Sequence, residues 1–265
     1  MSPTGTPPPL ARSRVVLVAD AAASVGRATA ILLAERGHVV LACSSSIEAL
    51  ADLPRETQQC GVVEISDALP GARAARAVEL FGRLDAIVAT SGAPRFGRLA
   101  SVPPSEALAP LYDALALIAE ATPLLSGGRV VLASLVPALP FAVAAAAVRG
   151  AFQALADPLR LELRTHGIQL ISVSTDLARP GPQDASPLEA LQRALSEGPG
   201  AHTLARPLAA TLRAMARQAP TPAAIAEVIV RALLAPRPKA RYLLRNGGRI
   251  IGRPTRPLDK ARGKL

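Results

Sequence analysis

The stretch RVVLVADAAASVGRATAILLAERGHVV, from Arg14 to Val40, decides the fold of this chain. It contains an apolar run, a turn of small residues that ends at Gly26, and a helical segment through Gly37. A buried strand, a tight turn and a helix that leads to a second strand open a dinucleotide-binding βαβ unit. Such a turn normally carries three glycines, and here Asp20 and Ser24 stand where the other two would be.

The alternation of apolar runs and helical segments continues along most of the chain. Strands are predicted at Val15–Ala19, Val39–Cys43, Gly61–Ile65, Leu84–Thr90, Arg129–Ser134, Ile168–Val173 and, at an edge, Arg241–Leu244. Further helices are predicted at Ile47–Leu53, Gly71–Phe81, Ser105–Leu124, Val143–His166, Leu188–Leu195, Leu208–Ala216 and from Pro222 to Leu234. Apolar strands separated by helices indicate a single α/β domain with a doubly wound, Rossmann-type parallel sheet.

The domain is predicted to span residues 14–244. Residues 1–13 are Pro-rich without an apolar core segment, which favours a disordered leader over a signal peptide. The turn formers after Thr175 open a predicted helical lid at about 177–220, over the sheet edge where such folds bind ligands. No apolar run reaches the roughly 20 residues that a transmembrane helix needs. With only Cys43 and Cys60, a disulfide framework is not expected, and we expect a cytoplasmic protein.

The positive charge is concentrated at the end of the chain. Ten Arg and Lys against Asp259 alone lie between Pro236 and Leu265, while the whole chain carries a net charge of +10. Residues 245–265 are therefore predicted to form a basic tail. Its chemistry suits anionic lipid, nucleic acid or an acidic protein surface, although charge runs more often only face solvent.

From about Arg14 to Leu244 the chain resembles the short-chain dehydrogenase/reductase family. ADAAASVGRA stands where that family has TGxxxGxG, LDAIVATSG where it has a strand ending in NNAG, and GRVVLAS where it has the strand with a catalytic Ser. VRGAFQALADPLRLELRTHGIQL stands where the family has SKxAL and the next crossover, and TPAAIAEVIVRALLAPRPKARYLL follows near the end. The resemblance implies the doubly wound fold and pairing of subunits through the two longest helices.

The family's catalytic residues are largely missing here. Its Tyr and Lys, which move the proton and hold the nicotinamide ribose, fall on Ala145 and Arg149, and Pro110 falls near the position of its relay Asn. An Arg side chain stays charged far above neutral pH, so it can hydrogen-bond a ligand but cannot shuttle a proton. Conventional carbonyl reduction is therefore not expected.

Three polar residues remain as catalytic candidates. Ser134 is one, although the family's Ser also aligns with Leu135; Arg149 and Tyr112 are the others. A half-buried aromatic with its hydroxyl in water is the ordinary alternative for Tyr112. Asp176 and Arg179 follow the sixth strand and are expected to form a surface ion pair.

The cofactor site is degenerate in the same way. Its candidate residues are Asp20, Ser24, Gly26, Ser44, Glu64, Ser91 and Gly92. The Asp20 carboxylate either repels a pyrophosphate, by about 3 kcal/mol at 5 Å, or caps the helix that begins near Ser24 and fills the anion site with the protein's own charge. We expect no NAD(P) binding or a weak one, with no readable preference between NAD and NADP. The residues indicate no metal site.

Three functions stay open from the sequence. The leading hypothesis is a divergent protein that has lost redox catalysis and acts either as a non-redox enzyme or as a pseudoenzyme that binds a small apolar molecule under the lid. As a pseudoenzyme it could form mixed oligomers with an active homologue. The alternatives are an atypical NAD(P)-dependent oxidoreductase that uses Ser134 and Tyr112, and an interaction protein that acts through its basic tail.

Overall fold

A computed structural model gives the three-dimensional structure. It describes residues 13–44, 48–53, 63–66, 72–92, 96–97, 102–125, 127–136, 140–196, 201–245 and 249–253. Within these ranges, residues 63–66, 196, 201–205, 245 and 249–253 are described by their backbone alone.

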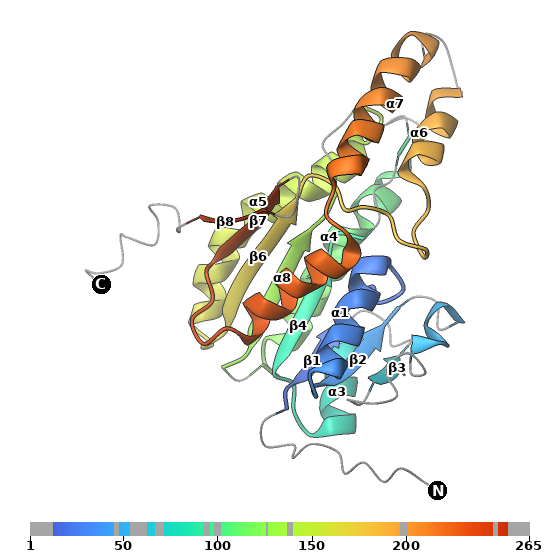
Figure 1. The fold of residues 1–265 in the computed structure, drawn as a ribbon. Coiled ribbons are helices and arrows are strands. Elements are labelled where there is room, and N and C mark those ends of the chain that lie inside the picture. The colour runs from blue at the N-terminus through green and yellow to red at the C-terminus, as the bar shows by residue number, and fades with distance from the viewer. Residues whose placement is uncertain are drawn as a thin grey trace, which may run out of the picture.

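The centre of the fold is one eight-stranded sheet with the order β3-β2-β1-β4-β5-β6-β7-β8 (Figure 1). Its first seven strands are parallel: β1 (Val15–Val18), β2 (Val39–Cys43), β3 (Val63–Ser66), β4 (Ala86–Thr90), β5 (Arg129–Ser134), β6 (Gln169–Thr175) and β7 (Arg241–Arg245). The strand order reverses between β1 and β4, which confirms the predicted doubly wound arrangement.

Helices cover both faces of the sheet, as a parallel sheet with apolar strands requires. On one face lie α1 (Ser24–Glu35) and α8 (Pro222–Leu234), whose buried residues share a core with alternate residues of the strands. On the other face lie α3 (Arg73–Phe81), α4 (Pro104–Ala121) and α5 (Val143–Arg164). The Thr221 hydroxyl accepts a hydrogen bond from the Ala224 backbone N–H at 3.2 Å, so α8 begins with the predicted N-cap followed by proline.

Two further helices lie within residues 177–220, the segment predicted to form a lid. Figure 1 shows α6 (Pro187–Ser196) and α7 (Ala201–Gln218) projecting from the body of the domain beyond the carboxyl ends of the strands. They pack on each other through an apolar cluster that includes Leu191, Leu195 and Leu212. Phe96 and Phe141 from the body of the domain contact this cluster. The two helices therefore pack on apolar side chains near the carboxyl edge of the sheet.

Two helix predictions need correction. The helix expected at Ile47–Leu53 is broken within the described residues 48–53: a 3-10 turn, Glu48–Leu50, is followed by a turn, and helical structure begins again only at Leu53. The second lid helix begins at Ala201, seven residues before the predicted Leu208, and contains Pro207. Pro207 removes one backbone N–H donor inside this helix, and the helix nevertheless continues through it.

The basic tail also needs correction, since part of it belongs to the sheet. Residues Arg249–Arg253 form β8, which pairs antiparallel with β7 from Arg241↔Arg253 to Arg245↔Arg249. The sequence carried two signals for this strand: the β-branched pair Ile250-Ile251, and an Asn-Gly dipeptide between two short runs, which is typical of a hairpin. The rest of the predicted tail, 254–265, and residues 1–12 of the predicted leader lie outside the described residues.

Candidate functional site

The candidate site lies at the carboxyl edge of the sheet, where the strand order reverses. The turn after β1 leads into α1, and the segments that follow β4, β5 and β6 lie beside it. Gly26 holds the turn close to the helix, because a Cβ at this position would lie 2.3 Å from the Asp20 carbonyl oxygen. The opening βαβ unit has therefore kept the close approach that only glycine permits.

A carboxylate from the segment between β6 and α6 occupies the N-terminus of α1. Asp184 Oδ1 accepts a hydrogen bond from the Ser24 backbone N–H at 3.0 Å, and its Oδ2 accepts one from the Gly181 N–H at 2.9 Å. The Ser24 hydroxyl also lies 3.0 Å from Gln183 Oε1. Free N–H groups at a helix start form a natural anion site. In this structure the protein's own anion fills that site.

The segment after β6 sits directly on α1. A Cβ added to Gly181 would lie 2.3 Å from Ser24 Oγ, so only glycine lets the backbone come this close. We predicted that Asp20 would cap α1, and this prediction named the wrong residue. The N-cap residue is Ala23, which makes no side-chain capping hydrogen bond, and Asp184 supplies the charge instead.

Asp20 faces the same cavity from the other side. It adopts a left-handed backbone conformation, with φ of 55°, and its Oδ2 accepts a hydrogen bond from the Thr90 hydroxyl at 3.2 Å. Burial raises the pKa of Asp20 from 3.8 to about 6; the Thr90 hydrogen bond lowers it, and the carboxylates of Asp184 and Asp113 raise it. This group is protonated more easily than an ordinary carboxyl, and near neutral pH it adds negative charge to the cavity.

The cavity between these groups is small. Its volume is about 40 Å³, and its lining includes Asp20, Gly26, Gly92, Leu135 and Asp184. This space suits a few waters, whereas ligand pockets usually measure about 300–1,000 Å³. Two carboxylates, an occupied helix N-terminus and so little space do not fit a dinucleotide pyrophosphate in this conformation.

The other predicted cofactor residues have mixed positions. Ser24 is buried beneath the lid segment, and Ser44 is buried at the end of β2. Ser91 is also buried, and its hydroxyl accepts the Leu135 backbone N–H at 3.0 Å, which ties the ends of β4 and β5 together. Glu64 belongs to β3, and its side chain lies outside the described residues.

Ser134 and Leu135, the two positions that could correspond to the family's Ser, face opposite sides of the sheet. Leu135 lines the cavity beside Asp20 and Gly92. Ser134 is 3% exposed and faces the opposite side, into a groove beside α5. Successive residues of a strand point to opposite faces of a sheet, so only one of the two can face the site. Our assignment of Ser134 to the cleft does not hold, and the cleft position carries an apolar side chain.

Arg149 and Ala145 lie on the first half of α5. Arg149 Nη2 pairs with Asp176 Oδ1 at 2.6 Å, and its Nη1 donates to the Val136 carbonyl at 3.4 Å. Ala145 is buried in a small apolar cluster with Val136 and Ala142. The family's proton-donating position is thus filled by an apolar cluster, and the neighbouring guanidinium is engaged in an ion pair.

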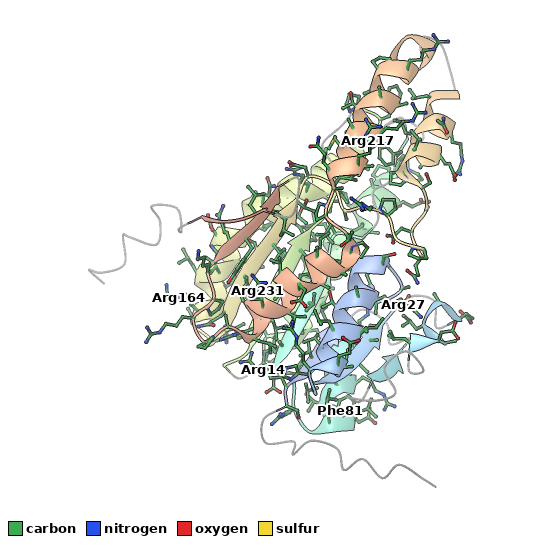
Figure 2. The ribbon with its side chains drawn as sticks, in the orientation of Figure 1. Arg14, Arg27, Phe81, Arg164, Arg217 and Arg231 are labelled. Carbon is green, nitrogen blue, oxygen red and sulfur yellow. The ribbon has the colours of Figure 1, made fainter. Side chains whose placement is uncertain are left out.

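Tyr112 lies away from these groups. It is 70% exposed on α4 and does not line the cavity, so its position does not support a catalytic role. The expected Asp176–Arg179 pair is not formed, because Asp176 pairs with Arg149. Arg179 donates instead to the backbone carbonyl of Arg217, which Figure 2 shows on α7 where this helix leaves the body of the domain.

The residues that sequence reasoning missed are Gly181, Gln183 and Asp184. They lie in the run ARPGPQDASP, which was interpreted only as turn formers at the start of a lid. Asp side chains in such turn-forming runs often accept hydrogen bonds from nearby backbone N–H groups, as Asp184 does from Gly181. That signal does not identify a target 160 residues away along the chain.

The described part of the chain holds neither a cluster of three or more His, Cys, Asp or Glu suited to a metal nor a helix long and apolar enough to cross a membrane. Burial raises the pKa of the Cys43 thiol to about 12, which makes it a poor nucleophile.

Comparison with known proteins relates the structure to one fold. No protein-family model and no curated protein matches the sequence. Among solved structures, a short-chain dehydrogenase from Streptomyces avermitilis aligns with a TM-score of 0.69 at 22% identity, over 87% of each chain. A short-chain dehydrogenase from Mycobacterium paratuberculosis bound to NAD gives 0.71 at 18% identity, over 89% of this chain and 96% of that one. An alcohol dehydrogenase from Thermococcus sibiricus complexed with 5-hydroxy-NADP gives 0.65 at 18% identity, over 92% and 100%. The chain has the short-chain dehydrogenase fold.

Proposed function

We propose that this chain is a divergent protein on the short-chain dehydrogenase scaffold that no longer reduces carbonyls with NAD(P)H. It acts as a non-redox protein, either as a binding subunit or in chemistry without hydride transfer. The observation that carries this proposal is the Asp184 carboxylate on the Ser24 N–H at 3.0 Å. A dinucleotide pyrophosphate needs this helix N-terminus, and a carboxylate already bound there excludes it by occupancy and by charge.

The chemistry of the neighbouring positions supports the same proposal. A carbonyl reduction needs a group that donates a proton near working pH within hydrogen-bond reach of the substrate oxygen. Leu135 and Ala145 have no such group, and the Arg149 guanidinium is engaged in an ion pair with Asp176. The lid contributes apolar side chains above them, which favours a small apolar molecule over a polar substrate.

Titration with NADH and NADPH by calorimetry tests this proposal. We expect no binding of either up to millimolar concentration, and no oxidation of NADPH with a panel of ketones. The NAD-bound Mycobacterium relative serves as the positive control. Binding in the micromolar range together with turnover at ordinary enzyme rates would overturn the proposal and establish the atypical oxidoreductase instead. That alternative requires residues 181–184 to leave α1 before the cofactor binds.

We also propose that the chain pairs with a second copy through α4. Leu108, Tyr112 and Leu115 are 44%, 70% and 39% exposed, and their spacing places them on one face of this helix. A stripe of large apolar side chains on a long helix is typical of a helix–helix interface. Pairing between copies accounts for the exposed position of Tyr112 better than catalysis does.

Replacing Tyr112 and Leu115 together with glutamate is expected to make the protein monomeric. Two charges placed in an apolar interface without partners cost more than a dimer of ordinary affinity tolerates. Light scattering after size exclusion measures the mass of the wild type, the double variant and Ser105→Glu, an exposed control at the start of the same helix. A wild type that is monomeric at high micromolar concentration, or a double variant with unchanged mass, would contradict this interface.

The interaction hypothesis for the basic tail remains a separate proposal. A test should remove residues 254–265 and keep β8, because truncation after Ala235 would also remove β7 and β8 from the sheet. A cytoplasmic setting is still our expectation, because the chain has only two cysteines, of which Cys43 is free.

A further inference from the structure

A second hollow lies on the sheet face that α5 covers, apart from the Asp20 cavity. This groove has a volume of about 380 Å³. One wall is α5, with Gly150, Phe152 and Gln153, and the other is formed by β5, β6 and β7. Its size falls within the range of about 300–1,000 Å³ that is usual for ligand sites.

Two residues that line this groove each carry a buried polar atom, and neither atom has a hydrogen-bond partner among the described residues. They are Ser134 Oγ, on a residue that is 3% exposed, and Arg241 Nε. Buried polar side-chain atoms in proteins are nearly always hydrogen-bonded. Because both residues line the same groove, we take these two atoms as the polar groups that a bound ligand would meet.

The charge around Arg241 favours an anion. Asp157 accepts hydrogen bonds from both Arg160 and Arg241, so two cations share one carboxylate. Burial raises the pKa of Asp157, but these hydrogen bonds and the attraction of the two guanidinium groups together outweigh burial and lower it, which keeps Asp157 ionised. One positive charge is left uncompensated within this trio. Because Arg Nε only donates, the ligand must present an acceptor there, and a carboxylate is the matching group.

The sheet register places Ser134 and Arg241 on the same face of the sheet. Ser134 pairs with Ser174 on β6, while Ser172, two residues earlier on that strand, pairs with Arg241 on β7. With usual strand spacings, the Ser134 and Arg241 Cα atoms lie about 12 Å apart, diagonally across the sheet. The wall between them includes the apolar side chains of Leu132, Phe152 and Leu243.

We propose that this groove binds an elongated organic carboxylate with a polar group at its far end. The carboxylate accepts the Arg241 Nε–H, the apolar body lies along Phe152, and the distal hydroxyl or carbonyl bonds Ser134 Oγ. The site is independent of the Asp20 cavity, so it does not depend on whether a cofactor binds there.

Calorimetry with 10-hydroxydecanoate tests this site, with 1,10-decanediol as the uncharged probe. We expect saturable binding of the acid, at least about tenfold tighter than that of the diol, because only the acid gains a charge-assisted hydrogen bond. Gly150→Leu fills the groove: Gly150 lines it, and a Cβ there meets nothing within 4 Å, so the variant should fold. It should weaken binding of the acid by about tenfold or more, and Ser134→Ala by about three- to tenfold.

The control is Ala210→Leu, which adds the same side chain at an exposed site on α7 away from the groove. A thermal melt of each variant establishes that it is folded, and Ser134→Ala decides the matter if Gly150→Leu does not fold. No saturable binding of 10-hydroxydecanoate at millimolar concentration would overturn the proposal. Equal affinity for acid and diol, or binding unchanged in the folded Gly150→Leu or Ser134→Ala protein, would overturn it as well.

Discussion

Replacing Asp184 with serine is expected to raise the affinity of the chain for NADPH about a hundredfold, because the variant removes the carboxylate from the α1 N-terminus. A unit charge about 5 Å from a pyrophosphate costs roughly 3 kcal/mol at an effective dielectric of 20, which corresponds to about two orders of magnitude in affinity. Wild-type binding is expected to be undetectable at millimolar NADPH, so the variant should reach the range of tens to hundreds of micromolar. Calorimetric titration with NADPH, and separately with inorganic pyrophosphate, measures the gain.

The matched control for this variant is Glu189→Gln. It removes one negative charge from an exposed position on α6 and leaves the α1 N-terminus occupied. We expect no gain in NADPH affinity from it, since an exposed charge is screened by solvent. An Asp184→Ser protein that is folded and still binds neither probe would show that occupancy by Asp184 is not what excludes the cofactor. An equal gain in NADPH affinity in both variants would show that the change in net charge, and not the freed helix N-terminus, causes the effect.

Replacing Asp20 with asparagine is expected to stabilise the protein at pH 8 and to leave it nearly unchanged at pH 4. The pKa of Asp20 is about 6 in the folded protein against an ordinary value of 3.8. Below pH 3.8 the carboxyl is protonated in both states, and as the pH rises through 6 the folded state must take up a buried charge that the unfolded state holds freely. The wild type therefore loses stability over this range, and the asparagine variant does not.

The expected gain at pH 8 is about 1–3 kcal/mol. A shift of two pKa units corresponds to roughly 3 kcal/mol, and the partial exposure of Asp20 reduces this value. The left-handed conformation at position 20 suits asparagine as well as aspartate, so the backbone adds no penalty. Urea unfolding at pH 4, 6 and 8 measures the difference, again with Glu189→Gln as the control. A gain that is absent at pH 8, or equal at all three pH values, would contradict a buried charge as its source.

The sequence predicted the layers of the fold because each element follows from local patterns. Short, β-branched apolar runs such as Val15–Val18 favour strands buried on both faces, and the Thr221-Pro222 pair favours a helix start through its capping hydroxyl and the fixed φ of proline. The strand β8 was missed because charge dominated the interpretation of its segment, although Asn246-Gly247 is a hairpin signal.

The candidate site was predictable only where it depends on residue type. The sequence shows directly that the Tyr-Lys pair for proton transfer is absent. It also predicts the role of Gly26, because a tight turn between strand and helix needs a glycine. The contact of Asp184 with Ser24 could not be predicted from the sequence. It joins residues that are distant in the chain, and it depends on the path of one loop. The side that Ser134 faces depended on strand register, and a shift of one residue exchanges it with Leu135.

The hairpin of β7 and β8 determines which strand forms the edge of the sheet that is open to other protein molecules. Without β8, the outer backbone groups of β7 would form an open edge onto which another chain could add a strand. With β8 in place, the sheet ends in a five-residue strand with arginine at each end, Arg249 and Arg253, and a glycine within it. Short edge strands that carry charged residues disfavour pairing with further strands, so we expect β8 to hinder edge-to-edge association between copies.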